Sequence, residues 1–491
     1  MTETVVMADP AEVDVVVDVD VVVVGAGLAG IGAAIELAAR DETFVVLERA
    51  GDVGGTWRDN TYPGVACDVP SHLYAFAHSP NPGWSRTFAP GHEIHTYLRG
   101  LAGRPGVAPH LRLGHEVTAA AWDASAGRWD VTTNRGRFRS RVLVLAAGRL
   151  TEPRIPAVPG LDGFDGPVFH SARWDHDAKL DGARVGVVGT GASAVQIVPE
   201  LAGRVEQLTV FARSNPYIIP RNDQAQAAAE PAEISRVREE VFAGMEQGIA
   251  ARRRERAALA ELRSRALGHL AAQVPDPALR ARLTPDYEVG CKRVLLSDTF
   301  YPAMNRDDVT LAGALRRLDG RTAIAADGHR ADLDVLVLAT GFHATRQPYA
   351  ERITGRGGVL LARAWERGMV SHASTVVHGF PNMFVLDGPN AALGHNSAVH
   401  VIESQLAYLT GALDHLAGHG GVLEVTSRAQ DEYTRDIDTM AERTVWLRGG
   451  CTSWYVDARS GRLTLLWPST ATAFRERNGH FDPAPFVAAD S

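Results

Sequence analysis

Residues 21–30 read Val-Val-Val-Val-Gly-Ala-Gly-Leu-Ala-Gly, and residues 187–194 repeat the pattern as Val-Val-Gly-Thr-Gly-Ala-Ser-Ala. In each stretch, β-branched residues typical of a strand buried on both faces lead into closely spaced glycines. A glycine loop between such a strand and a helix binds the pyrophosphate of a dinucleotide. Two loops in one chain therefore predict two nucleotide-binding domains, and two cofactors that exchange electrons.

The first loop has every part of a dinucleotide site in the right order. A strand is expected over 18–24, and after the loop a helix and a second apolar strand over 44–47 end at Glu48. The helix N-terminus faces the phosphate charge, and Glu48 is placed to accept hydrogen bonds from ribose hydroxyls. The glycines that allow the turn, the close approach of the pyrophosphate and the helix packing are Gly25, Gly27 and Gly30.

The acidic residue that would bind the ribose of NAD is missing from the segment after the second loop. The loop keeps two glycines and has alanine in the third place, a variant of the same motif. The strand expected over 208–211 then runs into Arg213, whose guanidinium suits the 2′-phosphate of NADPH, and Lys292 is a second candidate cation. The remaining residues expected at this NADPH site are Gly189, Gly191, Ala192, Ser193, Ala194 and Ser214.

Composition and charge exclude several classes of protein. The 491 residues carry a formal net charge of −8, which gives no reason to expect nucleic acid or an anionic membrane as a partner. No apolar run approaches the roughly 20 residues that a membrane helix needs. Three cysteines without a Cys-x-x-Cys pair cannot build a disulfide framework, which fits a reducing cytoplasm. No metal site is predicted.

The order of motifs predicts a split domain. The stretch 51–57, Gly-Asp-Val-Gly-Gly-Thr-Trp, resembles the FAD domain of two-dinucleotide flavoproteins, so FAD is expected at the first loop. We expect an α/β protein with two Rossmann-like domains, for FAD and NADPH, and a helical insertion rich in Ala, Glu and Arg. The expected boundaries are 15–160 and 333–491 for the FAD domain with the C-terminal region, 161–182 for a linker, 183–223 and 286–332 for the NADPH domain, and 224–285 for the insertion.

Two longer motifs resemble the fingerprints of type I Baeyer–Villiger monooxygenases, which belong to the class B flavoprotein monooxygenases. One is Phe164-x-Gly166-x-x-x-His170-x-x-x-Trp174-Asp175, and the other is Gly55-x-Trp57-x-x-x-x-Tyr62-Pro63-Gly64-x-x-x-Asp68. The stretch 339–342, Ala-Thr-Gly-Phe, resembles a motif shared by flavin monooxygenases. The resemblance runs from about residue 18 to about residue 470.

The resemblance implies an enzyme in which NADPH reduces a bound FAD. In the family, oxygen adds to the flavin C4a, the peroxyflavin attacks a ketone carbonyl, and migration of one carbon gives an ester or lactone. The implied partners are O2 and a small-molecule ketone, with no nucleic acid and no membrane. A monomer and a homodimer both remain open.

The resemblance also implies roles for single residues. Arg293 stands where the family has the cation that stabilises the peroxide and its adduct. Lys292 stands where the family has the cation that binds the 2′-phosphate of NADPH. Asp68 would orient Arg293 and accept a hydrogen bond from the nicotinamide amide. His170 and Trp174 are interpreted as packing and hinge elements. The further residues expected at the cofactors are Ala29, Thr56, Trp57, Tyr74, Asn396 and Trp454.

Several alternatives stay open. A heteroatom oxygenase that makes N-oxides or sulfoxides shares both glycine loops, although its linker usually lacks the terminal Trp-Asp. A flavin disulfide reductase would need a redox cysteine pair, which this chain lacks. A non-oxygenating NADPH oxidase or a cofactor-binding regulator fits the same loops. The Lys292-Arg293 pair also fits an exposed basic dipeptide, and Asp68 fits a turn cap.

Overall fold

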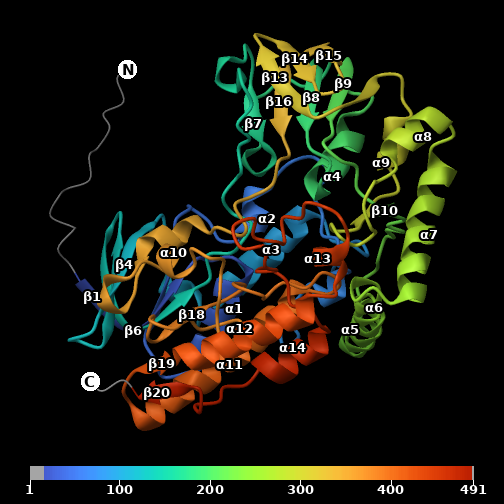
Figure 1. The fold of residues 1–491 in the computed structure, drawn as a ribbon. Coiled ribbons are helices and arrows are strands. Elements are labelled where there is room, and N and C mark those ends of the chain that lie inside the picture. Colours follow the sequence, from blue (N-terminus) through green and yellow to red (C-terminus); the bar gives the residue numbers. More distant parts are fainter. Residues whose placement is uncertain (1–15, 489–491) are drawn as a thin grey trace, which may run out of the picture.

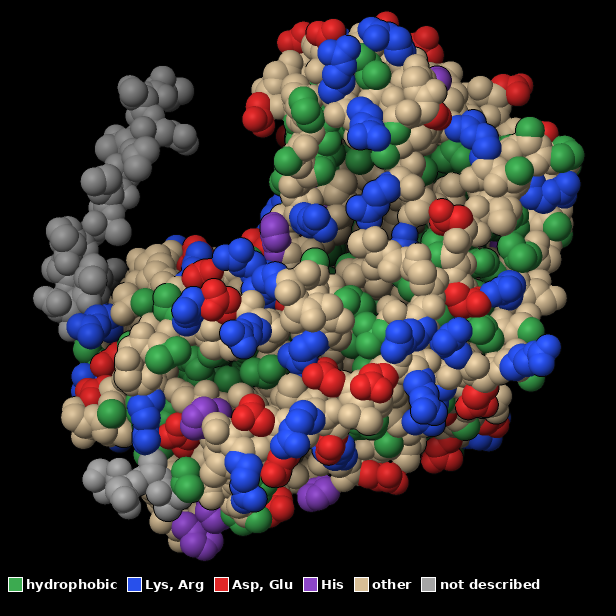
Figure 2. Space-filling view, viewed as in Figure 1, with side chains coloured by type: hydrophobic (Ala, Val, Ile, Leu, Met, Phe, Trp, Pro, Cys, Tyr) green, Lys and Arg blue, Asp and Glu red, His purple; other side chains and the backbone are tan. Residues whose placement is uncertain are grey.

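The computed structural model describes residues 16–488 and contains two α/β units of different size (Figure 1). Residue 15 and residues 489–491, at the outer ends of the expected FAD domain, lie outside the described residues. The large unit forms the lower part of Figure 1 and the small unit the upper part. Figure 2 shows that the surface is hollowed where the two units meet.

The large unit is built on a sheet whose centre is parallel. Across it lie β17 (Ile353–Thr354), β4 (Val117–Asp123), β5 (Arg128–Thr133), β6 (Gly136–Leu145), β1 (Val16–Val24), β2 (Phe44–Glu48) and β3 (Leu111–Leu113), and β18 (Met383–Val385) also pairs with β6. Val21, Val22 and Val23 of β1 are fully buried, as expected for a strand covered on both faces. One face packs against α1 (Leu28–Ala38), α3 (Gly91–Ala102) and α11 (Ala398–His419).

The small unit is a five-stranded parallel sheet. Its strands, in order, are β12 (Val309–Ala312), β9 (Gln207–Phe211), β8 (Arg184–Val188), β16 (Val335–Leu338) and β7 (Val168–His170). The helix after the second glycine loop, α4 (Ala192–Leu201), packs beside α9 (Phe300–Met304).

Two expected boundaries differ from the structure. Strand β7 lies inside the expected linker of 161–182, and β16 lies beyond the expected boundary at 333, yet both belong to the small sheet. The reason is that β16 fills the position between β8 and β7, where Leu336 and Val337 are fully buried. The chain therefore returns to the large unit after Leu338.

Four helices occupy the region of the expected insertion. They are α5 (Pro231–Glu246), α6 (Ile249–Arg252), α7 (Arg256–Gln273) and α8 (Pro277–Leu283). In Figure 1 they run along one side of the molecule, from the small unit down to α14 (Ala471–Asn478) of the large unit. Between residues 16 and 488, no helix combines the length and the apolar character required to cross a bilayer.

The remaining elements are short, apart from one C-terminal helix. Three small sheets consist of β10 (Ile218–Ile219) with β11 (Leu295–Leu296), of β13 (Leu315–Asp319), β14 (Thr322–Ala325) and β15 (Arg330–Asp332), and of β19 (Leu423–Val425) with β20 (Phe486–Ala488). The other helices are α2 (Thr56–Asp59), α10 (Leu361–Ala364), α12 (Ser427–Ala441) and α13 (Val445–Arg448).

Candidate active site

A cavity of about 440 Å³ lies at the carboxyl ends of β1, β2 and β6. Ligands of open α/β sheets bind at this edge. The cavity is lined by the following residues that sequence reasoning placed at FAD: Gly25, Gly27, Ala29, Glu48, Thr56, Trp57 and Tyr74. Trp57 donates from Nε1 to the Tyr74 hydroxyl at 3.2 Å, so these two aromatic side chains form one wall. Gly30 lies beneath the loop, where a Cβ would approach the Gly25 carbonyl oxygen to 1.8 Å.

The two glycine loops have the same geometry. Gly25 has φ +102°, and a Cβ there would lie 2.5 Å from the carbonyl oxygen of Ala146, just after β6. Gly189 has φ +119°, and a Cβ would lie 2.4 Å from the carbonyl oxygen of Ala339, just after β16. Each loop is therefore pressed against the end of a neighbouring strand, where only glycine fits. This shared geometry supports a dinucleotide at each loop.

Glu48 holds the first loop and faces the cavity. Its Oε2 accepts a hydrogen bond from the Ala26 backbone at 2.9 Å, and its Oε1 accepts from Ala50 at 2.9 Å and from Arg58 at 3.0 Å. A carboxylate has about four acceptor positions, so Glu48 retains capacity for a ribose hydroxyl. The ribose contact expected from the sequence stays a prediction.

Two cations lie together beside the second loop. Lys292 Nζ donates to Ser214 Oγ at 2.5 Å, and Thr190 of the loop donates to the Ser214 carbonyl at 2.6 Å. Burial and the neighbouring Arg213 lower the pKa of Lys292. Within residues 16–488, neither Lys292 nor the exposed Arg213 forms an ion pair with a carboxylate, which leaves both free to bind a phosphate.

Arg293 and Asp68 meet between the two units. Arg293 Nε donates to Asp68 Oδ2 at 2.6 Å across 225 positions of sequence. Asp68 raises the pKa of Arg293 still further, and although burial opposes ionisation of Asp68, Arg293 outweighs it and lowers the pKa of that carboxyl. The Tyr455 hydroxyl contacts the same guanidinium. The structure thus places a permanently charged, oriented cation here.

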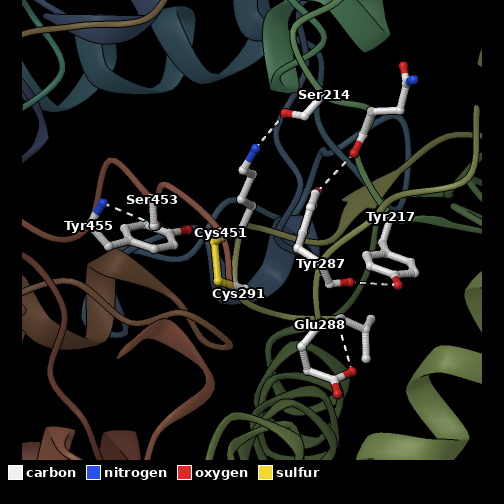
Figure 3. The surroundings of a disulfide bond; sticks show 11 residues. Ser214, Tyr217, Tyr287, Glu288, Cys291, Cys451, Ser453 and Tyr455 are labelled. Atoms are coloured by element: carbon white, nitrogen blue, oxygen red, sulfur yellow. Dashed lines mark hydrogen bonds between the residues drawn. A yellow bond between two sulfur atoms is a disulfide. The ribbon is translucent and has the colours of Figure 1, made fainter. Parts of the chain in front are cut away.

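Cys291 and Cys451 form a disulfide (Figure 3), which corrects the expectation drawn from the cysteine count. The two residues are 160 positions apart, so only the fold brings them together. The bond joins the segment of Lys292 and Arg293 to the C-terminal loop of Ser453 and Tyr455. Within the described residues, Cys67 is the free cysteine and is buried.

The two C-terminal residues expected at the cofactors, Asn396 at the flavin ring and Trp454 near the nicotinamide, differ in their surroundings. Asn396 is buried and directly precedes Ser397 and α11, whose first residue Ala398 lines the cavity. Trp454 is 42% exposed and does not line the cavity. Its neighbour Tyr455 is 2% exposed and contacts Arg293, so it is the residue of this segment that reaches the site.

The two linker residues lie in packed surroundings, and their role as packing and hinge elements stays a prediction. His170 ends β7, and burial lowers its pKa to about 4, so the ring is neutral at neutral pH. Its Nδ1 accepts from the Ala172 backbone at 3.1 Å, and its ring meets the edge of Phe342 at 5.5 Å. Trp174 packs edge-to-face on Phe169 at 5.1 Å.

Sequence reasoning missed a charged pair in the FAD cavity. Arg149 and Asp387 form an ion pair that lines it, and burial lowers the pKa of Arg149 to about 10. Arg149 follows the glycine turn that ends the segment 142–148, and Asp387 follows β18. The sequence could have indicated both residues as site candidates, because each comes after a strand. Their pairing could not be predicted, because it depends on the fold.

The comparisons with known proteins agree with this geometry. The family model for flavin-binding monooxygenase-like proteins matches residues 18–354. A Baeyer–Villiger monooxygenase of Streptomyces coelicolor is 46% identical over 479 residues, which cover 95% of this chain and 92% of the relative. The cyclohexanone monooxygenase from Rhodococcus sp. Phi1 bound to NADP⁺ superposes with a TM-score of 0.84 at 28% identity, over 94% of this chain and 96% of that one.

A second solved structure, of OTEMO in complex with FAD and NADP, superposes with a TM-score of 0.83 at 27% identity over 94% of this chain and 96% of that one. The chain therefore belongs to the flavin-binding monooxygenase-like family and, within it, to the type I Baeyer–Villiger monooxygenases. This confirms the α/β fold with two dinucleotide-binding domains and the two cofactors, FAD and NADP(H).

Replacing Arg213 by alanine is expected to raise the KM for NADPH by about 10- to 100-fold, because a charge-assisted hydrogen bond to the 2′-phosphate is lost. The KM for NADH should change little. Steady-state oxidation of both coenzymes measures the preference. Arg204→Ala is the control, since Arg204 pairs with Asp181 on the surface of the same unit. An unchanged preference would assign the phosphate to other ligands.

The disulfide is expected to survive purification, because Cys291 is fully buried and shielded from reductants. Denaturing alkylation without reductant should modify one cysteine, and alkylation after reduction should modify three. Intact-mass spectrometry counts the added groups. Three modified cysteines before reduction would contradict the bond.

Proposed function

We propose that Arg293 is the catalytic cation of this Baeyer–Villiger monooxygenase and that Asp68 is its positioning residue. The reaction consumes a ketone, O2, NADPH and a proton and yields an ester or lactone, NADP⁺ and water. FAD, when bound, supplies the redox chemistry that passes electrons from NADPH to O2. The observation that carries the proposal is the Arg293–Asp68 ion pair between the two units.

The chemistry needs a fixed positive charge. When an oxygen nucleophile adds to a ketone carbonyl, negative charge develops on the carbonyl oxygen, and a preorganised cation stabilises it. Arginine suits this task because it does not lose its proton. Asp68 accepts from Nε of Arg293 and the Tyr455 hydroxyl contacts the same guanidinium, so the N–H groups that neither of them binds remain available to that oxygen.

A further arginine, Arg252, adds to the positive potential of the site, whereas the charge of Arg149 is offset by its ion pair with Asp387. Burial lowers the pKa of both Arg149 and Arg252 to about 10, so each still carries its charge at neutral pH. Both lie near enough to Tyr455 to interact with its hydroxyl electrostatically. Low local polarity strengthens such charges, which favours an anionic oxygen over a neutral one.

We propose that FAD occupies the cavity at the large sheet and NADPH the second loop. The cavity-lining residues and the Asn396 loop support the first assignment, and Gly189, Arg213 and Lys292 support the second. On this basis, the large unit is the FAD domain and the small unit the NADPH domain. We further propose a cytoplasmic location, where NADPH is supplied, and either a monomer or a homodimer.

Arg293→Ala is expected to retain FAD and to accept hydride from NADPH, while ester formation falls by about 10²- to 10³-fold. Chromatographic product analysis with a ketone panel, and NADPH consumption in parallel, separate the two steps. Arg236→Ala is the control, because Arg236 pairs with Glu240 at the surface. Ester formation at the native rate would remove Arg293 from its role. Oxygenation of sulfides or amines alone by the native enzyme would indicate a heteroatom oxygenase.

A further inference from the structure

Glu246 lies in the helical insertion, but its carboxylate binds the large unit. It is the last residue of α5. Its Oε1 accepts from Asn396 Nδ2 at 2.9 Å, from His395 Nε2 at 3.2 Å and from the Ala471 backbone at 2.9 Å. Its Oε2 accepts from the Thr472 backbone at 3.1 Å and hydroxyl at 3.0 Å. One side chain thus satisfies donors from two segments that are far apart in sequence.

The charge of Glu246 is well stabilised. Burial opposes its ionisation, but the hydrogen bonds from His395, Ala471, Thr472 and Asn396 outweigh that effect and lower its pKa well below the usual range. Ala471 and Thr472 begin α14, and the positive end of a helix dipole favours a carboxylate. Glu246 therefore remains a carboxylate, a group that only accepts hydrogen bonds.

This acceptor fixes the side chains of the loop before α11. His395 must carry its proton on Nε2 to donate to Glu246, which leaves Nδ1 as an acceptor that is buried and without a partner among the described residues. Asn396 must direct Nδ2 at Glu246, so its Oδ1 accepts from the Ser397 backbone at 2.8 Å. Ser397 is the N-cap of α11, and the next residue, Ala398, lines the FAD cavity.

Other contacts attach the insertion without touching this loop. Arg238 of α5 donates to the backbone carbonyls of His72 and Ala75 and pairs with Glu403 of α11. Arg253 donates to Ser469 at 2.7 Å. Glu246 therefore provides the hydrogen bonds by which the insertion acts on residues 395 and 396.

We propose that Glu246 is a positioning residue that sets Asn396 and the start of α11 against the FAD site, so that the helical insertion shapes that site. The inference rests on the proposed placement of FAD beside this loop. On this proposal, the insertion contributes to the flavin site in addition to packing against the small unit.

The test is Glu246→Gln, because an amide turns one acceptor position into a donor that faces the N–H groups of Ala471 or Thr472. Losing a hydrogen bond to a charged group should raise the Kd of the apoprotein for FAD by about tenfold. The visible circular dichroism of bound oxidised FAD should also change. In the apoprotein, hydrogen exchange of peptide 394–400 should become faster, a readout that does not require FAD.

Two control variants separate positioning from stability. Glu240→Gln makes the same change on the same helix at an exposed residue that pairs with Arg236. Thr470→Ala removes the N-cap hydrogen bond to Ala473 and weakens α14 without touching residue 395 or 396. Both should leave the FAD spectrum and the exchange of peptide 394–400 unchanged. A Thr470→Ala variant that reproduces all effects of Glu246→Gln would overturn the inference.

Asn396→Ala distinguishes failure of the inference from failure of the proposed function. If Asn396→Ala changes the FAD spectrum and Kd but Glu246→Gln does not, Glu246 has no positioning role and the FAD placement stands. If neither variant changes them, residues 395 and 396 do not act on FAD and the inference is wrong, while the FAD placement keeps the support of the cavity-lining residues. Changes in both variants, absent from Glu240→Gln, are the expected result.

Discussion

The ion pair between Arg293 and Asp68 joins the two units of the molecule at the place where we propose that oxygenation occurs. A half-buried guanidinium is stabilised by a carboxylate partner, but a carboxylate that bound it fully would leave no donors for a substrate. Asp68 accepts at Nε alone, which supplies the partner and leaves terminal N–H groups of the guanidinium for a substrate. The surrounding structure holds this contact in place: Tyr62 of the large unit donates to Gln196 of α4 at 2.9 Å, and the Cys291–Cys451 disulfide restrains the segment next to Arg293.

The two sheets explain how one chain brings two cofactors to that pair. In each sheet, a glycine loop is pressed against the end of a neighbouring strand, at Ala146 in one case and at Ala339 in the other. Backbone contacts that leave no room for a side chain therefore fix the edge of each sheet at which its ligand would bind. The linker between the units contributes β7 and a neutral, buried His170, and its Arg173 pairs with Asp59 of α2 at 3.8 Å.

Local patterns predicted the parts of the fold that depend on local sequence. Strand periodicity and glycine spacing predicted β1, β8 and both loops, because these features need only a few neighbouring residues. The boundary at 333 was wrong, because the place of β16 in the small sheet depends on its pairing with β7 and β8. The Arg293–Asp68 contact was expected only through the family resemblance. The disulfide, the Arg149–Asp387 pair and Glu246 were missed, since each joins segments that are more than 100 positions apart.

The central claim is that the enzyme inserts one atom of O2 beside a ketone carbonyl. The most direct measurement is turnover of a ketone panel with NADPH under ¹⁸O2, followed by mass spectrometry of the products. The account predicts an ester or lactone with one ¹⁸O atom in the newly formed C–O–C linkage, in proportion to the NADPH consumed. Consumption of NADPH with release of labelled hydrogen peroxide and no labelled ester from any ketone would contradict it.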